Sequence, residues 1–210
     1  MTTGVPALQL DHLDYPDVRD RMLEEWAREI GNLERRWPRD NWPFGGDLNP
    51  SGWTRFLDSM PVALTERDMT WLAAQMSDNK LWHPTRTQTS KKGKPYSVRL
   101  NIPALATALA FGEFNVAYTH AVASLALDQG IPTCEVYRAG PAAIPRWSCT
   151  CLEGPGVSCA AVLEGERAYF TGRFAEITIP AGPNCHHSIR IREWLSGAAA
   201  ASGAAGRAES

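Results

Sequence analysis

Apolar residues recur at helical spacing in three stretches of the chain. The first stretch follows Asp14, a residue suited to cap the amino end of a helix, and it ends at Pro38. Its apolar residues return every three or four positions and form one face: Val18, Met22, Trp26, Ile30, Leu33 and Trp37. A shorter helix is predicted after the capping pair Thr65 and Asp68, and the longest one covers residues 101–127. The pattern therefore predicts three helices within the first two thirds of the chain.

The hydrophobic pattern changes in the last third of the chain. Residues 131–138 alternate like a strand, and residues 163–170 indicate two short strands joined by a turn at Gly165. Residues 176–179 alternate in the same way, and the prolines and glycine that follow predict a loop. We therefore expect an α+β fold, in which a helical N-terminal two thirds is followed by a small β-rich C-terminal unit that contains Cys and His.

Composition divides the chain into three regions. Residues 1–95 are expected to form an N-terminal helical, Trp-rich region, residues 96–195 combine the long helix with the β-rich Cys/His unit, and residues 196–210 form a disordered tail of small residues. Six of the eight tryptophans lie in the first 82 residues. Because tryptophan buries a large area, this cluster fits either the core of a helical subdomain or an interface that is exposed in the lone chain.

The formal net charge of −2 gives the chain no overall attraction for nucleic acid, so any such contact must be local. The local candidate is the polar segment 83–95, which we expect to be a loop. It contains no acidic residue and four basic ones: Arg86, Lys91, Lys92 and Lys94. This segment fits either a mobile solvated loop or a contact with DNA phosphates. No apolar run is long enough for a secretory signal or a membrane span, so we expect synthesis in a cytoplasm and no membrane contact.

Four of the five cysteines, together with two adjacent histidines, lie between Arg146 and Arg192. These candidate metal ligands are Cys149, Cys151, Cys159, Cys185, His186 and His187. Thiolates and imidazoles are groups that hold zinc in proteins, although their spacing here is less regular than a double Cys-x-x-Cys motif. An odd number of cysteines without an export signal disfavours a disulfide framework. Three interpretations remain: a bound zinc ion, packed free thiols, or cysteines that form disulfides or act as a nucleophile.

A catalytic interpretation of the same residues requires a cysteine beside a histidine and a carboxylate that orients the histidine. The candidate pairs and carboxylates are Cys185 with His186, Cys159 with His187, and Glu164 or Glu176. The pattern places no nucleophile at a helix N-terminus and indicates no oxyanion donors. We therefore expect no catalytic residues and no enzymatic activity.

The order of features from residue 98 to residue 192 resembles the C-terminal signature of phage minor head proteins of the Mu-type head-morphogenesis group and the related minor capsid proteins. The features are the long helix, a strand, the cysteine segment, the Leu163-Glu164-Gly165 turn and the Pro183-Asn184-Cys185 loop, which Ser188-Ile189-Arg190 follows. In that family two cysteines usually stand two residues apart before the turn, and the loop usually opens with His and carries Arg after its cysteine. Here the pair is Cys149-x-Cys151, Gly182 opens the loop and His186 follows the cysteine.

This resemblance implies a structural virion component made in the host cytoplasm, a minor head protein associated with the portal or the inner capsid. Such a protein would assist head assembly or DNA packaging and ejection. Its partners would be portal and capsid proteins, with DNA contact through segment 83–95. One alternative is a zinc-stabilised protein-interaction module of cellular origin, which would bind its partner through the Trp-rich half. A second alternative is a Cys/His-dependent hydrolase.

Overall fold

The computed structural model describes residues 8–36, 44, 46–140, 152–171, 175–180 and 185–195. Its fold is mixed α+β, as the sequence pattern predicts, with helices mostly in the N-terminal part and small antiparallel sheets. The elements are, in chain order, α1 (Val18–Arg36), α2 (Pro50–Thr65), α3 (Met69–Gln75), η1 (Asn79–Leu81), β1 (Thr85–Thr89), β2 (Pro95–Arg99), α4 (Ile102–Asp128), β3 (Thr133–Arg138), β4 (Gly154–Ser158), α6 (Cys159–Thr171) and β5 (His187–Arg190).

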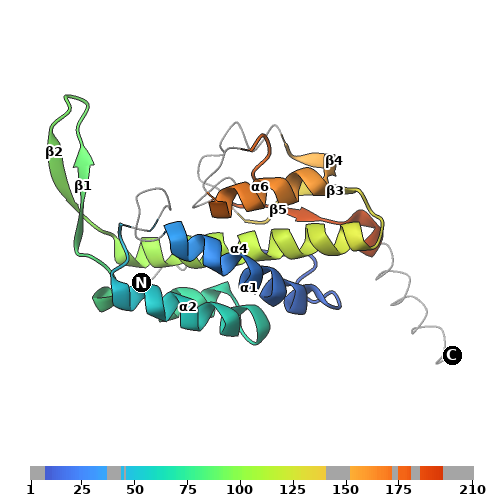
Figure 1. Ribbon diagram of the computed structural model, residues 1–210, viewed down its shortest axis with the longest axis horizontal. Helices are drawn as coiled ribbons and strands as arrows, with labels where there is room; N and C mark the ends of the chain where they lie inside the picture. The colour runs from blue at the N-terminus through green and yellow to red at the C-terminus, as the bar shows by residue number, and fades with distance from the viewer. Residues whose placement is uncertain are drawn as a thin grey trace.

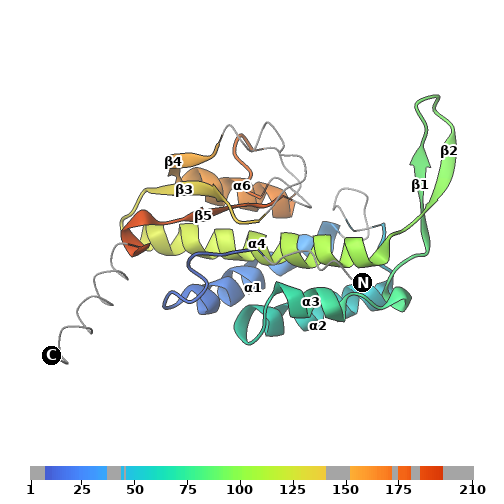
Figure 2. The ribbon, with the colours of Figure 1, turned by 180° about the vertical axis from the view of Figure 1, so that it is seen from behind.

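Helix α4 lies at the centre of the molecule, and the other helices and the larger sheet pack around it. Figures 1 and 2 show α1 to α3 along one side of α4, and α6 with the three-stranded sheet along the opposite side. Almost every side chain between residues 106 and 126 is buried, so this helix has no polar face. Asn101 caps its amino end by accepting a hydrogen bond from the backbone N–H of Ala104, and Pro103 occupies the first turn. The helix predicted over residues 101–127 is confirmed.

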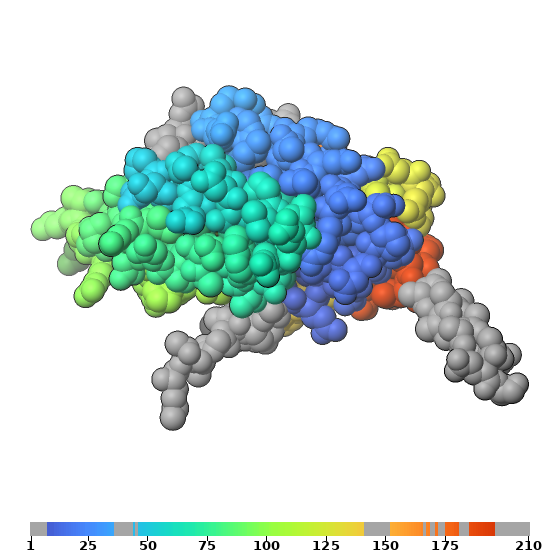
Figure 3. All heavy atoms as spheres, turned by 90° about the horizontal axis from the view of Figure 1, so that it is seen from below, coloured from blue at the N-terminus to red at the C-terminus, as the bar shows by residue number. Residues whose placement is uncertain are grey.

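Helices α1, α2 and α3 form the first layer, and their side chains make the surface seen from below in Figure 3. Trp26 of α1, Trp53 of α2 and Trp82 after η1 are buried, with exposed fractions of 4%, 7% and 3%. These tryptophans are therefore core residues of the helical part and not an exposed interface. Trp37 and Trp42 lie outside the described residues.

The sequence pattern misses helix α2, because its first residues, from Asn49 to Gly52, are typical of a turn. In the structure Asn49 is the cap of the helix, accepting a hydrogen bond from the backbone N–H of Gly52 at 2.9 Å, and Pro50 occupies the first turn. Only glycine fits at position 52, since a Cβ atom there would lie 2.0 Å from the backbone oxygen of Leu81. The shorter helix predicted after Asp68 is confirmed as α3, which Asp68 caps.

Most of segment 83–95, predicted to be a loop, belongs to a two-stranded antiparallel hairpin. Strands β1 and β2 pair from Thr85 with Arg99 to Thr89 with Pro95, and the hairpin projects from one end of α4 (Figures 1 and 2). No residue of the two strands is buried. The prediction is wrong because strands without a buried face show no alternation of apolar and polar residues.

Residues 163–170 belong to helix α6 and do not form two strands with a turn. The helix follows from its composition, because Ala, Leu and Glu are strong helix formers, and its buried residues recur at helical spacing. Gly165 serves a close approach, since a Cβ atom there would lie 1.9 Å from the backbone oxygen of Ile177. Residues 176–179 form no strand, so this prediction is also wrong.

Strand β3 is the centre of a three-stranded antiparallel sheet with the order β4-β3-β5. It accounts for most of the strand predicted over residues 131–138, which is confirmed. Residues 133–136 pair with β4, and residues 135–138 pair with β5. The tail predicted over residues 196–210 lies outside the described residues.

The segment before α1 packs against the last described residues of the chain. The Nε2 atom of the His12 ring accepts a hydrogen bond from the backbone N–H of Ile191, at 2.7 Å. The rings of Tyr15 and Trp194 stack with their centroids 4.2 Å apart. One hydrophobic core therefore includes residues of both predicted regions, 1–95 and 96–195.

Glu135 of β3 forms charged hydrogen bonds with Arg190 and Arg192, and Arg190 in turn connects it to the segment before α1. Its Oε1 atom accepts from Nη2 of Arg190 at 2.9 Å, and its Oε2 atom accepts from Nε of Arg192 at 2.6 Å. Arg190 also donates to Oδ2 of Asp11, at 3.0 Å. The hydrogen bonds from Arg190 and then from Arg192 lower the pKa of Glu135 from 4.5 to about 2.

We expect Glu135→Gln to lower the free energy of unfolding at neutral pH by about 1.5–3 kcal/mol, because a neutral amide loses the charge-assisted hydrogen bonds. The pKa of Glu135 is lower in the folded state, so its stabilisation is present above pH 4.5 and is lost as the pH falls toward 2. Urea unfolding at several pH values checks this expectation. The difference between parent and variant should shrink in acid, whereas Glu164→Gln, at an exposed position, should change little at any pH. A Glu135→Gln difference that stays constant with pH would contradict the network.

Candidate functional site

The thiols of the described residues are divided between the two ends of β3. Cys134 of β3 and Cys159, the first residue of α6, lie together at one end. A hydrogen bond between their thiols raises the pKa of Cys134 and lowers the pKa of Cys159. Cys185 and His187 lie at the other end, because His187 pairs with Arg138, the last residue of β3.

A cluster here called the Cys185 triad consists of Cys185, His187 and Glu153. It lies at the edge of the sheet where β3 ends and where β4 and β5 begin. The Nδ1 atom of His187 lies 3.8 Å from the Sγ atom of Cys185. Glu153 stands just before β4, and its Oε1 atom lies 2.6 Å from the Nε2 atom of His187. Nη2 of Arg138 donates to the same Oε1 atom at 2.6 Å. The sheet thus aligns a thiol, an imidazole and a carboxylate in one row.

The carboxylate of the triad is ionised and determines which nitrogen of His187 carries the hydrogen. Hydrogen bonds from Arg138 and then from His187 lower the pKa of Glu153 below its ordinary range. An ionised carboxylate only accepts hydrogen bonds, so the Nε2 atom of His187 is the donor. In the neutral ring the Nδ1 atom then has a lone pair, and this atom faces the Cys185 sulfur. The arrangement places a base beside a thiol.

A cavity of about 120 Å³ lies next to the triad. Its walls come from the first half of α4 and from the residues just before β5: Ala104, Thr107, Ala108, Phe111, Gly112, Cys185 and His186. The Nδ1 atom of His186 is buried and has no hydrogen-bond partner among the described residues. The cavity therefore adjoins one member of the triad, Cys185.

Helix α4 fixes the strand that carries His187. The Nδ2 atom of Asn115, which is fully buried, donates to the backbone carbonyl of His187 at 2.8 Å. The hydroxyl of Tyr118 donates to the backbone carbonyl of Ile189 at 3.4 Å and accepts from the backbone N–H of His12 at 3.0 Å. These contacts involve only backbone atoms of β5, so the imidazole of His187 remains available to Cys185 and Glu153.

The structure brings together only part of the predicted zinc-ligand set. Cys149 and Cys151 lie outside the described residues. Cys159 and Cys185 lie at opposite ends of β3, on the order of 15 Å apart at roughly 3.3 Å per residue, so they do not share one ion. Within the ranges that the structure describes, no group of three or more His, Cys, Asp and Glu side chains is placed to hold a metal. A zinc site that uses Cys149 and Cys151 stays a prediction.

The partners within the triad differ from those expected from the sequence. Cys185 faces His187 and not His186, because alternate residues of an extended segment share one face. The carboxylate is Glu153, 34 positions before His187, and only the pairing of β3 with its two neighbours brings it there. The glutamates expected in this role are exposed on or near α6: Glu164 and Glu176. The alternation of residues around Cys185 could have indicated that Cys185 and His187 share a face. No sequence pattern indicated that Glu153 contacts His187.

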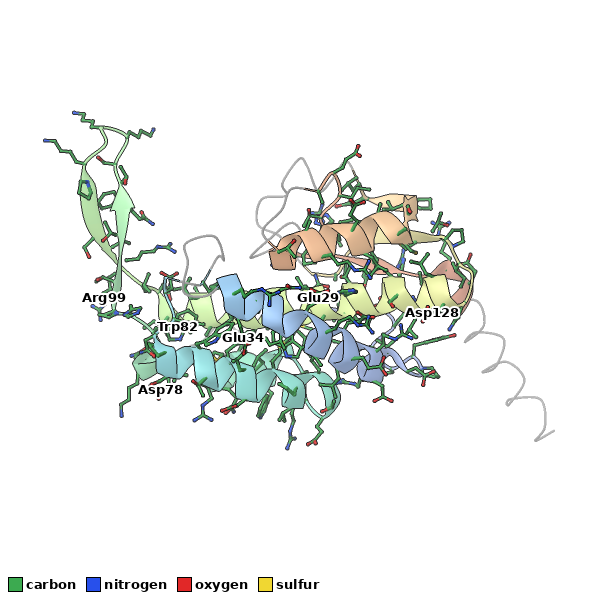
Figure 4. All side chains as sticks on the ribbon, viewed as in Figure 1. Glu29, Glu34, Asp78, Trp82, Arg99 and Asp128 are labelled. Atoms are coloured by element: carbon green, nitrogen blue, oxygen red, sulfur yellow. The ribbon has the colours of Figure 1, made fainter. Side chains whose placement is uncertain are left out.

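The four predicted DNA-contact residues all lie on the hairpin, here called the basic arm (residues 83–99): Arg86, Lys91, Lys92 and Lys94. Nη1 of Arg86 donates to Oδ2 of Asp47 at 3.0 Å and anchors the base of the arm, where Figure 4 labels Arg99. The lysines are exposed in the turn between the strands. Gly93 closes this turn with a φ of 74°, which glycine adopts without strain, and its N–H donates to the carbonyl of Ser90.

A separate buried ionic cluster joins α1 to α4. The Oε2 atom of Glu25 accepts a hydrogen bond from Arg28 at 2.7 Å and lies 3.2 Å from Nε2 of His120, while its Oε1 atom accepts from Ser124 at 3.1 Å. Burial lowers the pKa of His120, and the charge of Glu25 opposes this effect. Since the charge of Glu25 is matched by these neighbours, the cluster fastens the two helices to each other.

Comparison with known proteins identifies no relative of this chain. No family model, no curated protein and no solved structure matches it. Among the helices of the described ranges, none is long and apolar enough to cross a membrane. The chemistry available for a functional proposal is therefore that of the basic arm and of the Cys185 triad.

We expect two glycine substitutions in buried helices to act in opposite directions. A Cβ atom at Gly112 would meet no atom within 4 Å, so Gly112→Ala should stabilise α4 by about 0.5–1 kcal/mol through higher helix propensity. A Cβ atom at Gly165 would overlap the backbone oxygen of Ile177, so Gly165→Ala should destabilise the protein by about 1–3 kcal/mol. Urea unfolding of both variants checks this pair. A loss of stability in Gly112→Ala would contradict the open space beside α4.

Proposed function

We propose that this protein is a structural component of a phage head, a minor head protein that binds DNA through the basic arm. The body of the protein then contacts portal or capsid proteins and assists head assembly or DNA packaging and ejection. The supporting observation is the basic arm, which is a projecting hairpin without a single acidic residue. The resemblance of residues 98–192 to the Mu-type minor head proteins supports the phage setting.

Charge is distributed so that the arm is the part of the protein that attracts phosphate. The arm carries five positive charges and the whole chain carries −2, so the remainder of the chain carries −7. A polyanion is therefore repelled by the body and attracted by the arm, and the arm determines the orientation of binding. Each phosphate that a lysine or arginine neutralises adds affinity, and salt removes that affinity.

The shape of the arm suits a nucleic-acid groove. A two-stranded ribbon fits the major groove of duplex DNA. The turn at the tip is closed by hydrogen bonds between the backbone atoms of Ser90 and Lys94 and between those of Gly93 and Ser90. Its three lysines are thus presented together at the tip. The strand β2 leads into α4 within a few residues, so the arm is fixed to the most buried element of the fold.

The test is binding to a duplex DNA, followed by fluorescence anisotropy at several salt concentrations. The combined variant Lys91→Gln, Lys92→Gln, Lys94→Gln should bind more weakly, because it removes up to three phosphate contacts. The slope of log affinity against log salt concentration should fall by about 2–3, at roughly 0.9 per contact.

The matched control removes the same charge from the body: Arg55→Gln, Arg67→Gln, Lys80→Gln, all at exposed positions. This variant should bind DNA as the parent does or more weakly only by a small factor. Equal losses in the two triple variants, or parent binding without salt dependence, would contradict the role of the arm. Absence of the protein from purified phage particles would contradict the virion assignment.

A further inference from the structure

We propose that Cys185 is a nucleophilic thiol that accepts a small acyl group, with His187 as its base and Glu153 as the residue that positions His187. This activity is independent of DNA binding by the arm, because Cys185, His187 and Glu153 belong to the sheet and its flanking residues and none of them belongs to the arm. It rests on the geometry of the Cys185 triad and on the cavity beside it. A thiol, an imidazole and a carboxylate in a row are the arrangement that covalent catalysis by cysteine requires.

The first step of the argument concerns the proton of the thiol. Glu153 and Arg138 hold the ring of His187 with its Nε2–H directed at the carboxylate. The Nδ1 atom is therefore an acceptor, and it lies 3.8 Å from the Cys185 sulfur, within reach of a weak S–H hydrogen bond. Transfer of the thiol proton to Nδ1 gives a thiolate beside an imidazolium, and the ionised Glu153 stabilises that imidazolium. The thiolate is the nucleophilic form of cysteine.

The second step concerns the size of the substrate. A water molecule occupies about 30 Å³ in the liquid, so a cavity of about 120 Å³ holds on the order of four groups of that size. An acetyl or propionyl group fits this space. The apolar wall of α4 suits the alkyl part of the group.

The reaction is an acyl transfer from a small activated ester or thioester. The thiolate of Cys185 attacks the carbonyl carbon, a C–S bond forms, and the bond from that carbon to the leaving oxygen or sulfur breaks. The leaving group takes the proton that His187 received from the thiol. The products are a thioester on Cys185 and a free alcohol or thiol, and no oxidant or reductant is involved.

The other described thiols provide an internal comparison. Cys134 and Cys159 are hydrogen-bonded to each other, and their exposed fractions are 4% and 0%. The hydrogen bond from Cys134 lowers the pKa of Cys159. If a reagent modifies Cys185 and leaves Cys134 and Cys159 unmodified, the selectivity comes from the triad and the cavity and not from general thiol reactivity.

The experiment treats the full chain with p-nitrophenyl acetate and combines stopped-flow release of nitrophenolate with mass-spectrometric mapping of the acetylated residue. We expect one rapid equivalent of nitrophenolate and acetyl on Cys185. Cys185→Ser should abolish this phase. His187→Gln should slow it by about 100-fold or more, the usual effect of losing a positioned general base.

The positioning role of Glu153 has its own readout. Glu153→Gln should lower the first-order rate constant of acetylation at saturating ester, while the ester concentration that gives half of the maximal rate stays unchanged. A purely structural role would alter the melting temperature and both kinetic parameters together. Melting curves of all variants establish that each one is folded.

The cavity has a separate test. Gly112→Leu, which fills space beside α4, should slow acetylation by at least about tenfold without removing any triad atom. Cys159→Ala should react as the parent does.

Three results would overturn the proposal. One is acetylation of Cys134, Cys159, Cys149 or Cys151 in place of Cys185. Another is a rate for Cys185 that His187→Gln does not change in a folded protein. The third is reaction of Cys185 only after a chelator removes a bound metal, which would make the thiol a ligand and not a nucleophile.

Discussion

The fold depends on the burial of α4 on all sides. A helix of 27 residues whose middle has no polar face is stable in water only when other elements cover it completely. Helices α1 to α3 cover one side, and α6 with the sheet covers the other. Asn115 is a polar group of α4 that a covering element matches, because its side chain donates to the carbonyl of His187. This requirement fixes β5, and with it the Cys185 triad, against the first half of the helix.

The Cys185 triad and the basic arm, the two candidate functional features, are held in place by different kinds of contact. Cys185 and His187 are buried, whereas Glu153 lies at the exposed edge of the sheet. The geometry of this triad comes from a sheet and a buried helix whose hydrogen bonds hold the backbone of β5. The basic arm is exposed on both faces, and a hairpin of this kind has little stability of its own. Its order comes from the anchor of Arg86 on Asp47 and from its continuity with α4. One feature suits precise chemistry on a small group, and the other suits an extended polyanion.

The spacing of apolar residues along the chain predicted some helices and missed other elements. The apolar spacing from Val18 to Trp37 and the long stretch over α4 were sufficient for two helices. The basic arm has no buried face, so it left no pattern of period two. Helix α2 does carry apolar residues at helical spacing, namely Trp53, Phe56, Met60 and Leu64, but the turn-like residues at its start led to its being missed. In α6, Gly165 suggested a turn, although it serves a close backbone approach that depends on residues not adjacent in sequence.

The sequence predicted which segment of the chain carries the candidate site, but not which side chains come together there. The concentration of Cys and His near residue 185 indicated the position of candidate reactive side chains, and the alternation of an extended segment would have selected His187 over His186. The carboxylate was not predictable, because Glu153 reaches His187 only through the order β4-β3-β5. The pairing of Cys134 with Cys159 likewise depends on the position of α6 relative to the sheet.

The hydrogen bond between His12 and Ile191 joins positions 179 residues apart and has a consequence for biosynthesis. Neither this contact nor the stacking of Tyr15 on Trp194 can form before almost all of the described chain has left the ribosome. Until then the apolar surface that these residues cover stays open to other chains. Contacts of such long range slow folding and lengthen the exposure of sticky intermediates. The nascent chain therefore exposes this apolar surface until Ile191 and Trp194 emerge.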